Sequence, residues 1–102
     1  MIDRIERHRR ELSELCNKLK IRRLEVFGSA ATGDFKPGES DVDFIVEFEE
    51  SEAEPGLLSR YLTLSEELSE LLGTEVEIIT PQSIRNPYFR RSVDRTRERV
   101  YG

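Results

Sequence analysis

The chain has 102 residues, a length that suits one domain built around a single hydrophobic core. Charged and hydrophobic residues each make up 36% of the sequence, which is typical of a globular protein and excludes an intrinsically disordered one. The single cysteine, Cys16, excludes an internal disulfide, and no apolar run approaches the roughly 18–20 residues of a membrane span. Because the first ten residues also lack a signal-peptide pattern, we expect a cytoplasmic protein with one domain over residues 1–102.

The net charge of −5 is spread unevenly along the chain. Residues 1–24 hold eight Lys or Arg and four acids, and residues 85–102 hold six Arg and two acids, so that each end carries +4. Residues 25–84 therefore carry −13. Such an acidic middle repels nucleic acid unless metal ions neutralise it, so we do not expect direct nucleic-acid binding.

Residues 3–20 are predicted to form one helix, with Asp3 and Glu6 as an acidic capping box at its start. We expect His8 to pack against this helix rather than act as a base, and Cys16 to be a small core residue. The side chains that recur at three- and four-residue steps and predict the helix are Ile5, His8, Leu12, Leu15, Cys16 and Leu19.

The next segment is predicted to contain two strands. Residues 21–27 form the first, 30–32 a short helical turn that ends at Gly33, and 41–48 the second strand. The sequence does not decide whether these two strands run antiparallel. Residues 47–54 contain five glutamates and no basic residue, and we expect them to form a solvated loop.

The second half of the chain is predicted to add a helix, a strand and a final helix. A leucine-rich stripe predicts a helix over 57–72 that ends at Gly73. Residues 75–79 read as a strand in which Val76 and Ile78 share one face and Glu77 lies on the other.

Thr80 and Pro81 predict the start of a helical turn, which Asn86 and Pro87 interrupt. Residues 88–97 are predicted to be helical, with Tyr88, Phe89 and Val93 facing inward. The last few residues are left open as a strand or a frayed end.

Two motifs around the second strand carry the chemistry. The first strand ends in Gly28 and Ser29, and after eleven intervening residues Asp41 and Asp43 stand at the head of the second strand. Alternate strand residues share a face, so these two carboxylates, about 7 Å apart at the backbone, can converge. Hard oxygen ligands of this kind suit Mg²⁺ together with substrate phosphates. A glycine allows a sharp turn, and a helix that begins at Ser29 would favour a phosphate at its start.

This pattern, with its spacing and strand context, resembles the polymerase-β-like nucleotidyltransferase superfamily, and most closely its minimal members of about a hundred residues. The resemblance extends to 57–73 as the helix before the last core strand and to 74–81 as that strand and its exit. It implies an α/β (α+β) fold with a small mixed sheet flanked by helices. It also implies Mg²⁺, two ions, held by Asp41 and Asp43, and ATP phosphates at Gly28 and Ser29.

The resemblance further assigns a third carboxylate to Glu77, as a metal ligand or general base. Relatives usually have aspartate at this position, and the added methylene of glutamate moves the carboxylate on a site that tolerates little misplacement. The ordinary alternative is a solvent-facing glutamate like Glu75.

Minimal nucleotidyltransferases of this kind are typically antitoxins that pair with HEPN-domain toxins. The resemblance therefore implies an antitoxin that transfers AMP from ATP to a hydroxyl of the toxin, a tyrosine in some family members. The first alternative is an inactive antitoxin that neutralises the toxin by binding alone. A transferase that acts on RNA or a small molecule, and an unrelated α/β domain, are weaker alternatives.

A cluster of arginines near the C-terminus is open to several interpretations. It could be a solvated helix face, a triphosphate contact, a partner-docking surface or an RNA contact, the last being the least supported because no stacking aromatics alternate with it. Its members are Arg85, Arg90, Arg91, Arg95, Arg97 and Arg99.

Overall fold

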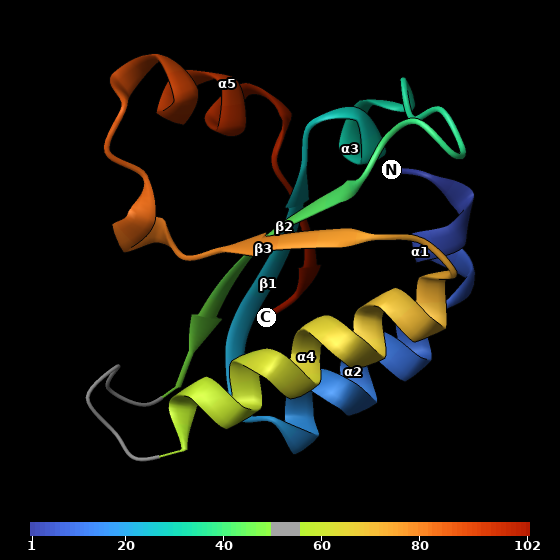
Figure 1. The fold of residues 1–102 in the computed structure, drawn as a ribbon, viewed down its shortest axis with the longest axis vertical. Coiled ribbons are helices and arrows are strands. Elements are labelled where there is room, and N and C mark those ends of the chain that lie inside the picture. Colours follow the sequence, from blue (N-terminus) through green and yellow to red (C-terminus); the bar gives the residue numbers. More distant parts are fainter. Residues whose placement is uncertain (50–55) are drawn as a thin grey trace.

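The computed structural model describes residues 1–49 and 56–102. In these residues a four-stranded sheet has the order β3-β2-β1-β4, with helices against both of its faces (Figure 1). The elements in chain order are α1 (Asp3–Arg7), α2 (Arg9–Lys18), β1 (Ile21–Phe27), α3 (Ser29–Thr32), β2 (Val42–Phe48), α4 (Leu57–Leu72), β3 (Val76–Ile79), the 3-10 turn η1 (Pro81–Ser83), α5 (Pro87–Thr96) and β4 (Glu98–Tyr101).

The sheet is mixed, as the sequence predicted. β1 runs antiparallel to both β2 and β4, whereas β2 runs parallel to β3. The parallel pair is connected through α4, which carries the chain back across the sheet. β4 settles the open question about the last residues, because it pairs with β1 at the edge of the sheet.

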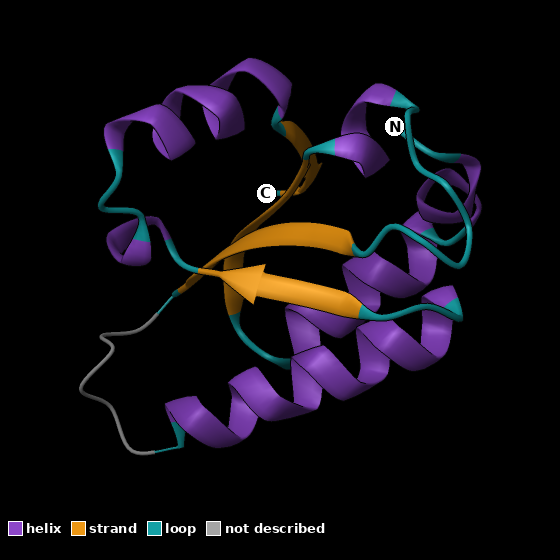
Figure 2. Ribbon diagram, turned by 45° about the horizontal axis from the view of Figure 1, so that its top comes forward, coloured by secondary structure: helices purple, strands orange, loops and turns teal. Residues whose placement is uncertain are grey.

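One face of the sheet is covered by α2 and α4, which lie side by side (Figures 1 and 2). Val42, Phe44 and Val46 of β2 are fully buried on this face. From the helices, the buried side chains are Leu12, Leu15, Cys16, Leu64, Leu68 and Leu72. The α4 bounds and the left-handed Gly73 that ends it are as predicted, since a leucine stripe of helical period followed by glycine is a strong local signal.

The other face is covered by α5 and η1 over part of its area. A second, smaller cluster of buried side chains lies there, formed by Phe27, Ile45, Ile84 and Val93. Ile45 alternates with Phe44 and Val46 along β2, so this strand contributes to an apolar cluster on each face.

The predicted helix over residues 3–20 is wrong in one respect, because it is broken at His8 into α1 and α2. The His8 ring nitrogen Nδ1 lies 2.6 Å from the Arg4 carbonyl oxygen, while the His8 N–H bonds to the Ile5 carbonyl. The side chain thus takes the carbonyl that an unbroken helix would pair with the His8 N–H. The predicted capping box is also absent, since Asp3 forms an ion pair with Arg7 at 2.9 Å.

The inward placement of Tyr88 is also wrong, because this side chain is 74% exposed. α5 begins at Pro87, with the Asn86 side chain accepting hydrogen bonds from the N–H groups of Tyr88 and Phe89. Val93 faces the sheet as predicted. Tyr88 lies five positions before Val93. At about 100° per residue this separation is about 500°, or roughly 140° beyond one full turn, so Tyr88 lies on the outer side of the helix.

Two further predictions concern loops and membranes. The glutamate-rich segment 47–54 falls mostly on residues 50–55, which lie outside the described part of the chain, so its prediction stays untested. Within residues 1–49 and 56–102, no helix has the length and apolar character that crossing a membrane requires.

Candidate functional site

The two halves of the sequence motif meet at one end of the sheet. Phe27, the last residue of β1, stands opposite Asp43 in the antiparallel ladder, and Asp43 stands opposite Glu77 in the parallel ladder. Asp41 directly precedes β2 and is exposed. α3 follows β1 and lies beside the start of β2 (Figure 1). The structure therefore brings together the glycine turn and the three predicted carboxylates.

Asp43 lies at the centre of this group. The pKa of its carboxyl is raised to about 6, mainly by burial and in addition by the negative charges of Glu77 and Asp41. Three acids thus share one small region, and among the described residues no basic side chain lowers the pKa of Asp43, so a bound cation would relieve their repulsion.

Gly28 has a conformation that only glycine adopts readily, with φ 71° and ψ −148°. A side chain there would also meet Asp43, because a Cβ atom on Gly28 would lie 3.0 Å from Asp43 Oδ2. The Gly28 carbonyl accepts hydrogen bonds from the N–H groups of Ala31 and Thr32, which starts α3 at Ser29, one residue before the predicted turn. The glycine therefore keeps the space beside Asp43 open.

The Gly28 N–H group is not free to bind a phosphate. It donates to Thr96 Oγ1, at the end of α5, with a nitrogen–oxygen distance of 2.9 Å. Sequence reasoning missed Thr96, because no motif marks it and it lies 68 positions after the glycine that it contacts.

The carboxylates can be compared with the ligands that Mg²⁺ prefers. Among the described residues, no group of three or more His, Cys, Asp and Glu side chains is arranged to hold a metal ion unaided. Mg²⁺ does not require such a group, since it commonly binds one or two carboxylates and completes its shell with water and substrate phosphates. Asp41 and Asp43 supply hard oxygen ligands where negative charge is concentrated, and this donor set fits Mg²⁺.

Several of the C-terminal arginines are already used within the fold. Arg97 pairs with Glu25 at 2.6 Å and with Asp94 at 2.9 Å. Arg90 donates to the carbonyl oxygens of Pro81 and Ile84, and the guanidinium of Arg91 lies 5.2 Å from the centre of the Tyr88 ring. The cluster is therefore not one continuous solvated surface.

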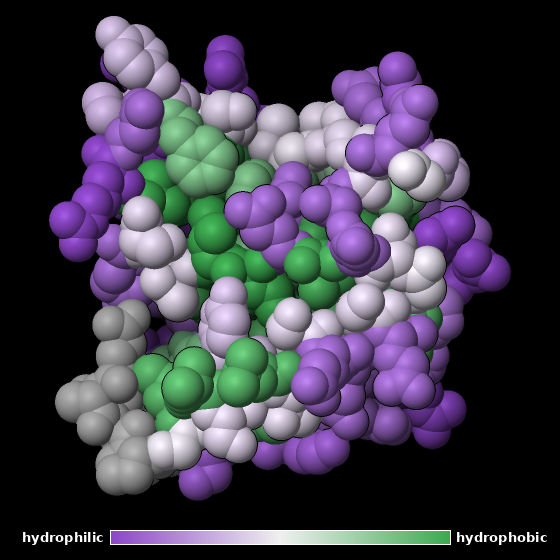
Figure 3. Space-filling model, viewed as in Figure 1, coloured by the Kyte–Doolittle hydropathy of each residue, from purple (hydrophilic) through white to green (hydrophobic). Residues whose placement is uncertain are grey.

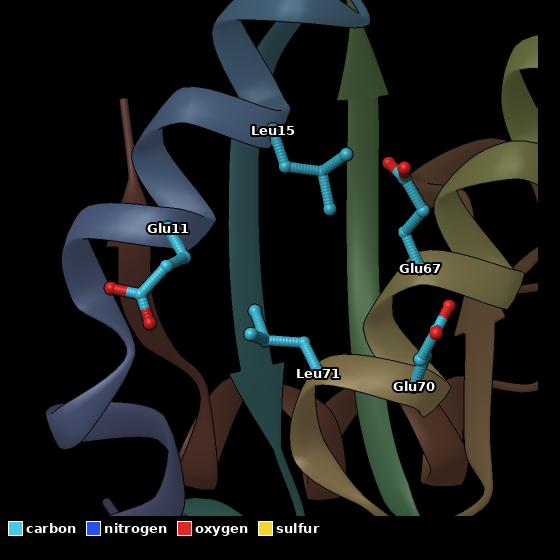
Figure 4. Close-up of a pocket in the computed structure, with 5 residues that line it drawn as sticks. All are labelled: Glu11, Leu15, Glu67, Glu70 and Leu71. Carbon is cyan, nitrogen blue, oxygen red and sulfur yellow. The ribbon is translucent and has the colours of Figure 1, made fainter.

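A groove between α2 and α4 is separate from the carboxylate group (Figure 4). It has a volume of about 250 Å³, and the figure shows its lining side chains, Glu11, Leu15, Glu67, Glu70 and Leu71. α2 and α4 cover the sheet face that carries Phe44, whereas Asp43 belongs to the opposite face. Cys16 does not supply a nucleophile to the groove or to the carboxylate group, because burial raises the pKa of its thiol to about 12.

The chain is similar in sequence to a described protein family and to named relatives. The family described as "Nucleotidyltransferase domain" matches residues 5–100. The protein adenylyltransferase MntA of Thermococcus cleftensis is 38% identical over 79 residues, which cover 78% of this chain and 72% of that protein. MJ1379 of Methanocaldococcus jannaschii, a candidate protein adenylyltransferase, is 41% identical over 80 residues, 78% of this chain and 77% of that protein.

Solved structures show the same fold. A candidate minimal nucleotidyltransferase superposes with a TM-score of 0.72 at 31% identity, covering 92% of this chain and 90% of its own. The MNT antitoxin complex with the tri-AMPylated HEPN toxin of Shewanella oneidensis contains a chain that matches with a TM-score of 0.61 at 15% identity, covering 96% of this chain and 72% of that one. The present chain therefore belongs to the nucleotidyltransferase domain family and is a homologue of the MntA protein adenylyltransferase.

Proposed function

We propose that this protein is the antitoxin of a HEPN toxin pair and transfers AMP from ATP to a tyrosine hydroxyl of the toxin in the cytoplasm. The observation that carries this proposal is the grouping of Asp41, Asp43 and Glu77 beside the open turn at Gly28. The naming of two relatives as protein adenylyltransferases supports AMP as the transferred group.

In this proposal each residue has a separate task. Asp41 and Asp43 would hold two Mg²⁺ ions, which when bound would neutralise the phosphates of ATP and stabilise the attacking and leaving oxygens. Ser29 and the start of α3 would contact the β and γ phosphates. The tyrosine oxygen forms a bond to the α-phosphorus, and the bond from that phosphorus to pyrophosphate breaks. Glu77 accepts the proton of the hydroxyl on its carboxylate.

A protein partner is supported by the surface of the chain. Large apolar side chains are exposed on two helices: Leu58 by 71% and Leu62 by 52% on α4, and Phe89 by 42% on α5. Figure 3 shows apolar surface over the first half of α4 and again between β3 and α5. Exposed apolar groups of this kind often mark protein contacts. The solved relatives that are toxin–antitoxin complexes support a HEPN toxin as the partner.

One observation favours a second function, inhibition of the toxin by binding alone. Glu77 is exposed and stands where family members usually carry aspartate, and the described carboxylates form no ready-made three-ligand group. If the longer side chain cannot reach the nucleophile, the same fold would bind the toxin without modifying it.

The two functions are separated by the intact mass of the cognate HEPN toxin, after incubation with this protein, ATP and Mg²⁺. AMP transfer predicts a mass gain in AMP steps that disappears with the double variant Asp41→Asn/Asp43→Asn. This variant is expected to keep its fold and its binding to the toxin. No mass gain, in a complex that forms and silences the toxin, would overturn the transfer proposal in favour of inhibition by binding. Transfer retained by the double variant would show that the site is misassigned.

A further inference from the structure

The turn that begins the candidate nucleotide site is held by a residue from the far end of the chain. The Gly28 N–H donates to Thr96 Oγ1 at 2.9 Å, one residue past the end of β1 at Phe27. Both residues are partly buried. When a buried N–H group loses its acceptor, the cost in free energy is larger than the net contribution of the hydrogen bond to stability. This contact therefore restricts the orientation of the Gly28 peptide.

The chemistry of the hydroxyl suits this task. The Thr96 O–H group can donate to either of two carbonyls of its own helix, Ser92 at 3.1 Å or Val93 at 3.3 Å. This leaves a lone pair on Oγ1 for the Gly28 N–H. Serine could make the same two contacts, whereas valine, which has nearly the shape of threonine, could make neither.

The end of α5 is itself fixed to β1, so that the hydroxyl is held in place. Next to Thr96, the Arg97 guanidinium makes two contacts with the Glu25 carboxylate, at 2.6 and 3.3 Å. Farther up the helix, the Phe89 ring packs edge-on against Phe27 with 6.0 Å between ring centres. Phe27 directly precedes Gly28 and stands opposite Asp43. Three contacts therefore join α5 to the strand that leads into the turn.

We propose that Thr96 is a positioning residue for nucleotide binding: by holding the Gly28 N–H it keeps the turn, the start of α3 and the open space beside Asp43 in one arrangement. The turn bonds α3 through the Gly28 carbonyl and lies next to Asp43 Oδ2. A rotation of the Gly28 peptide would therefore move both sides of the site. The nucleotide part of this inference rests on the proposed function, while the effect on the turn does not.

The test compares Thr96→Val and Thr96→Ser in the full chain, with Thr63→Val as the matched control. Thr63 lies on α4, on the opposite side of the sheet, so its substitution removes a hydroxyl without touching the turn. The first readout is hydrogen exchange of the Gly28 amide by NMR. Thr96→Val is expected to speed this exchange by roughly tenfold relative to the wild type, and Thr96→Ser and Thr63→Val to leave it near the wild-type value.

The second readout is the affinity for ATP in the presence of Mg²⁺, measured by calorimetry, with KM and kcat for AMP transfer. Thr96→Val is expected to weaken binding and raise KM by roughly three- to tenfold, with a smaller change in kcat, because the turn contacts bound ATP before and during the reaction. Thr96→Ser is expected to restore both values.

Two results would overturn the inference. One is a Gly28 amide that exchanges at the wild-type rate in Thr96→Val. The other is faster exchange with unchanged affinity for ATP, which would reduce Thr96 to a structural contact. If the wild type neither binds ATP with Mg²⁺ nor transfers AMP, the proposed function fails instead, and the amide exchange still decides whether Thr96 holds the turn.

Discussion

The two faces of the sheet differ in what covers them. The face toward α2 and α4 is closed, and side chains such as Phe44, Leu12 and Leu68 have no exposed surface there. The face toward α5 has only a small buried cluster, and the exposed Asp41 and Glu77 lie with Asp43 at its open end. One strand, β2, serves both faces by alternation. The comparison indicates that stability is concentrated on one face, which leaves the other able to carry like charges at close range.

The largest expected effect tests the closed face. Phe44→Ala removes a fully buried ring from the main core, so we expect it to lower the free energy of unfolding by about 3–5 kcal/mol. Ile45→Ala, one residue along and on the other face, is expected to cost about 2–3 kcal/mol, because its cluster is smaller and can relax. Urea denaturation measures both. Equal losses would contradict the proposed difference between the faces.

The next effect tests the ion pair between Glu25 of β1 and Arg97, which directly follows α5. Glu25 is buried, and Glu25→Gln would remove the charge of this partner and leave Arg97 with the half-exposed Asp94 as its remaining ion-pair partner. We expect a loss of about 2–3 kcal/mol in urea denaturation. Glu14→Gln is the matched control, since the pair of Glu14 with Arg10 is 3.8 Å long and exposed, and it should cost less than about 0.5 kcal/mol. Similar losses in both variants would mean that the Glu25 contact is no stronger than a surface pair.

The closed face could be predicted from the sequence more fully than the open one. The bounds of β1 and α4 followed from local patterns, since apolar alternation and a leucine stripe need no knowledge of distant residues. The break at His8 was missed because a side-chain bond to a backbone carbonyl leaves no periodic signal.

The candidate site could be predicted in its members but not in its geometry. The spacing of Gly28, Asp41 and Asp43 and the family resemblance predicted which residues matter. The placement of Glu77 opposite Asp43 depends on the parallel pairing of β2 with β3, which the sequence did not give. The role of Thr96 depends on where α5 ends in space, and no local pattern encodes that.

A smaller effect tests whether Glu77 takes part in transfer. Glu77→Gln keeps the shape of the side chain but removes the group that we propose accepts the proton, so AMP transfer is expected to fall at least about tenfold. Glu75→Gln, two residues earlier and also exposed, is the matched control and should change the rate less than about twofold. The measurement is the initial rate of mass gain of the HEPN partner. A near-normal rate for Glu77→Gln would make this residue an ordinary surface glutamate.

The smallest effect concerns stability without metal. Because the pKa of Asp43 is raised to about 6 from 3.8, ionising this carboxyl costs folding free energy. The cost is absent below about pH 3.8, grows as the pH rises toward 6, and stays constant above it. Asp43→Asn should therefore stabilise the EDTA-treated protein by less than about 1 kcal/mol above pH 6.5, since solvent screens a half-buried carboxylate.

Thermal unfolding of the wild type and Asp43→Asn, each between pH 4.5 and pH 7.5, measures this gain. The gain should shrink toward zero as the pH falls, because the wild-type carboxyl then becomes protonated and neutral like the asparagine. Adding Mg²⁺ at pH 7.5 should make the wild type more stable than Asp43→Asn. The wild type keeps the Asp43 carboxylate, and binding of the ion there would relieve the repulsion between the acids. A gain that does not depend on pH would mean that packing, rather than the ionisation of a buried carboxyl beside Glu77 and Asp41, limits stability at Asp43. The open face would then be less stable because it is poorly covered, and not because it concentrates the carboxylates that the proposed reaction needs.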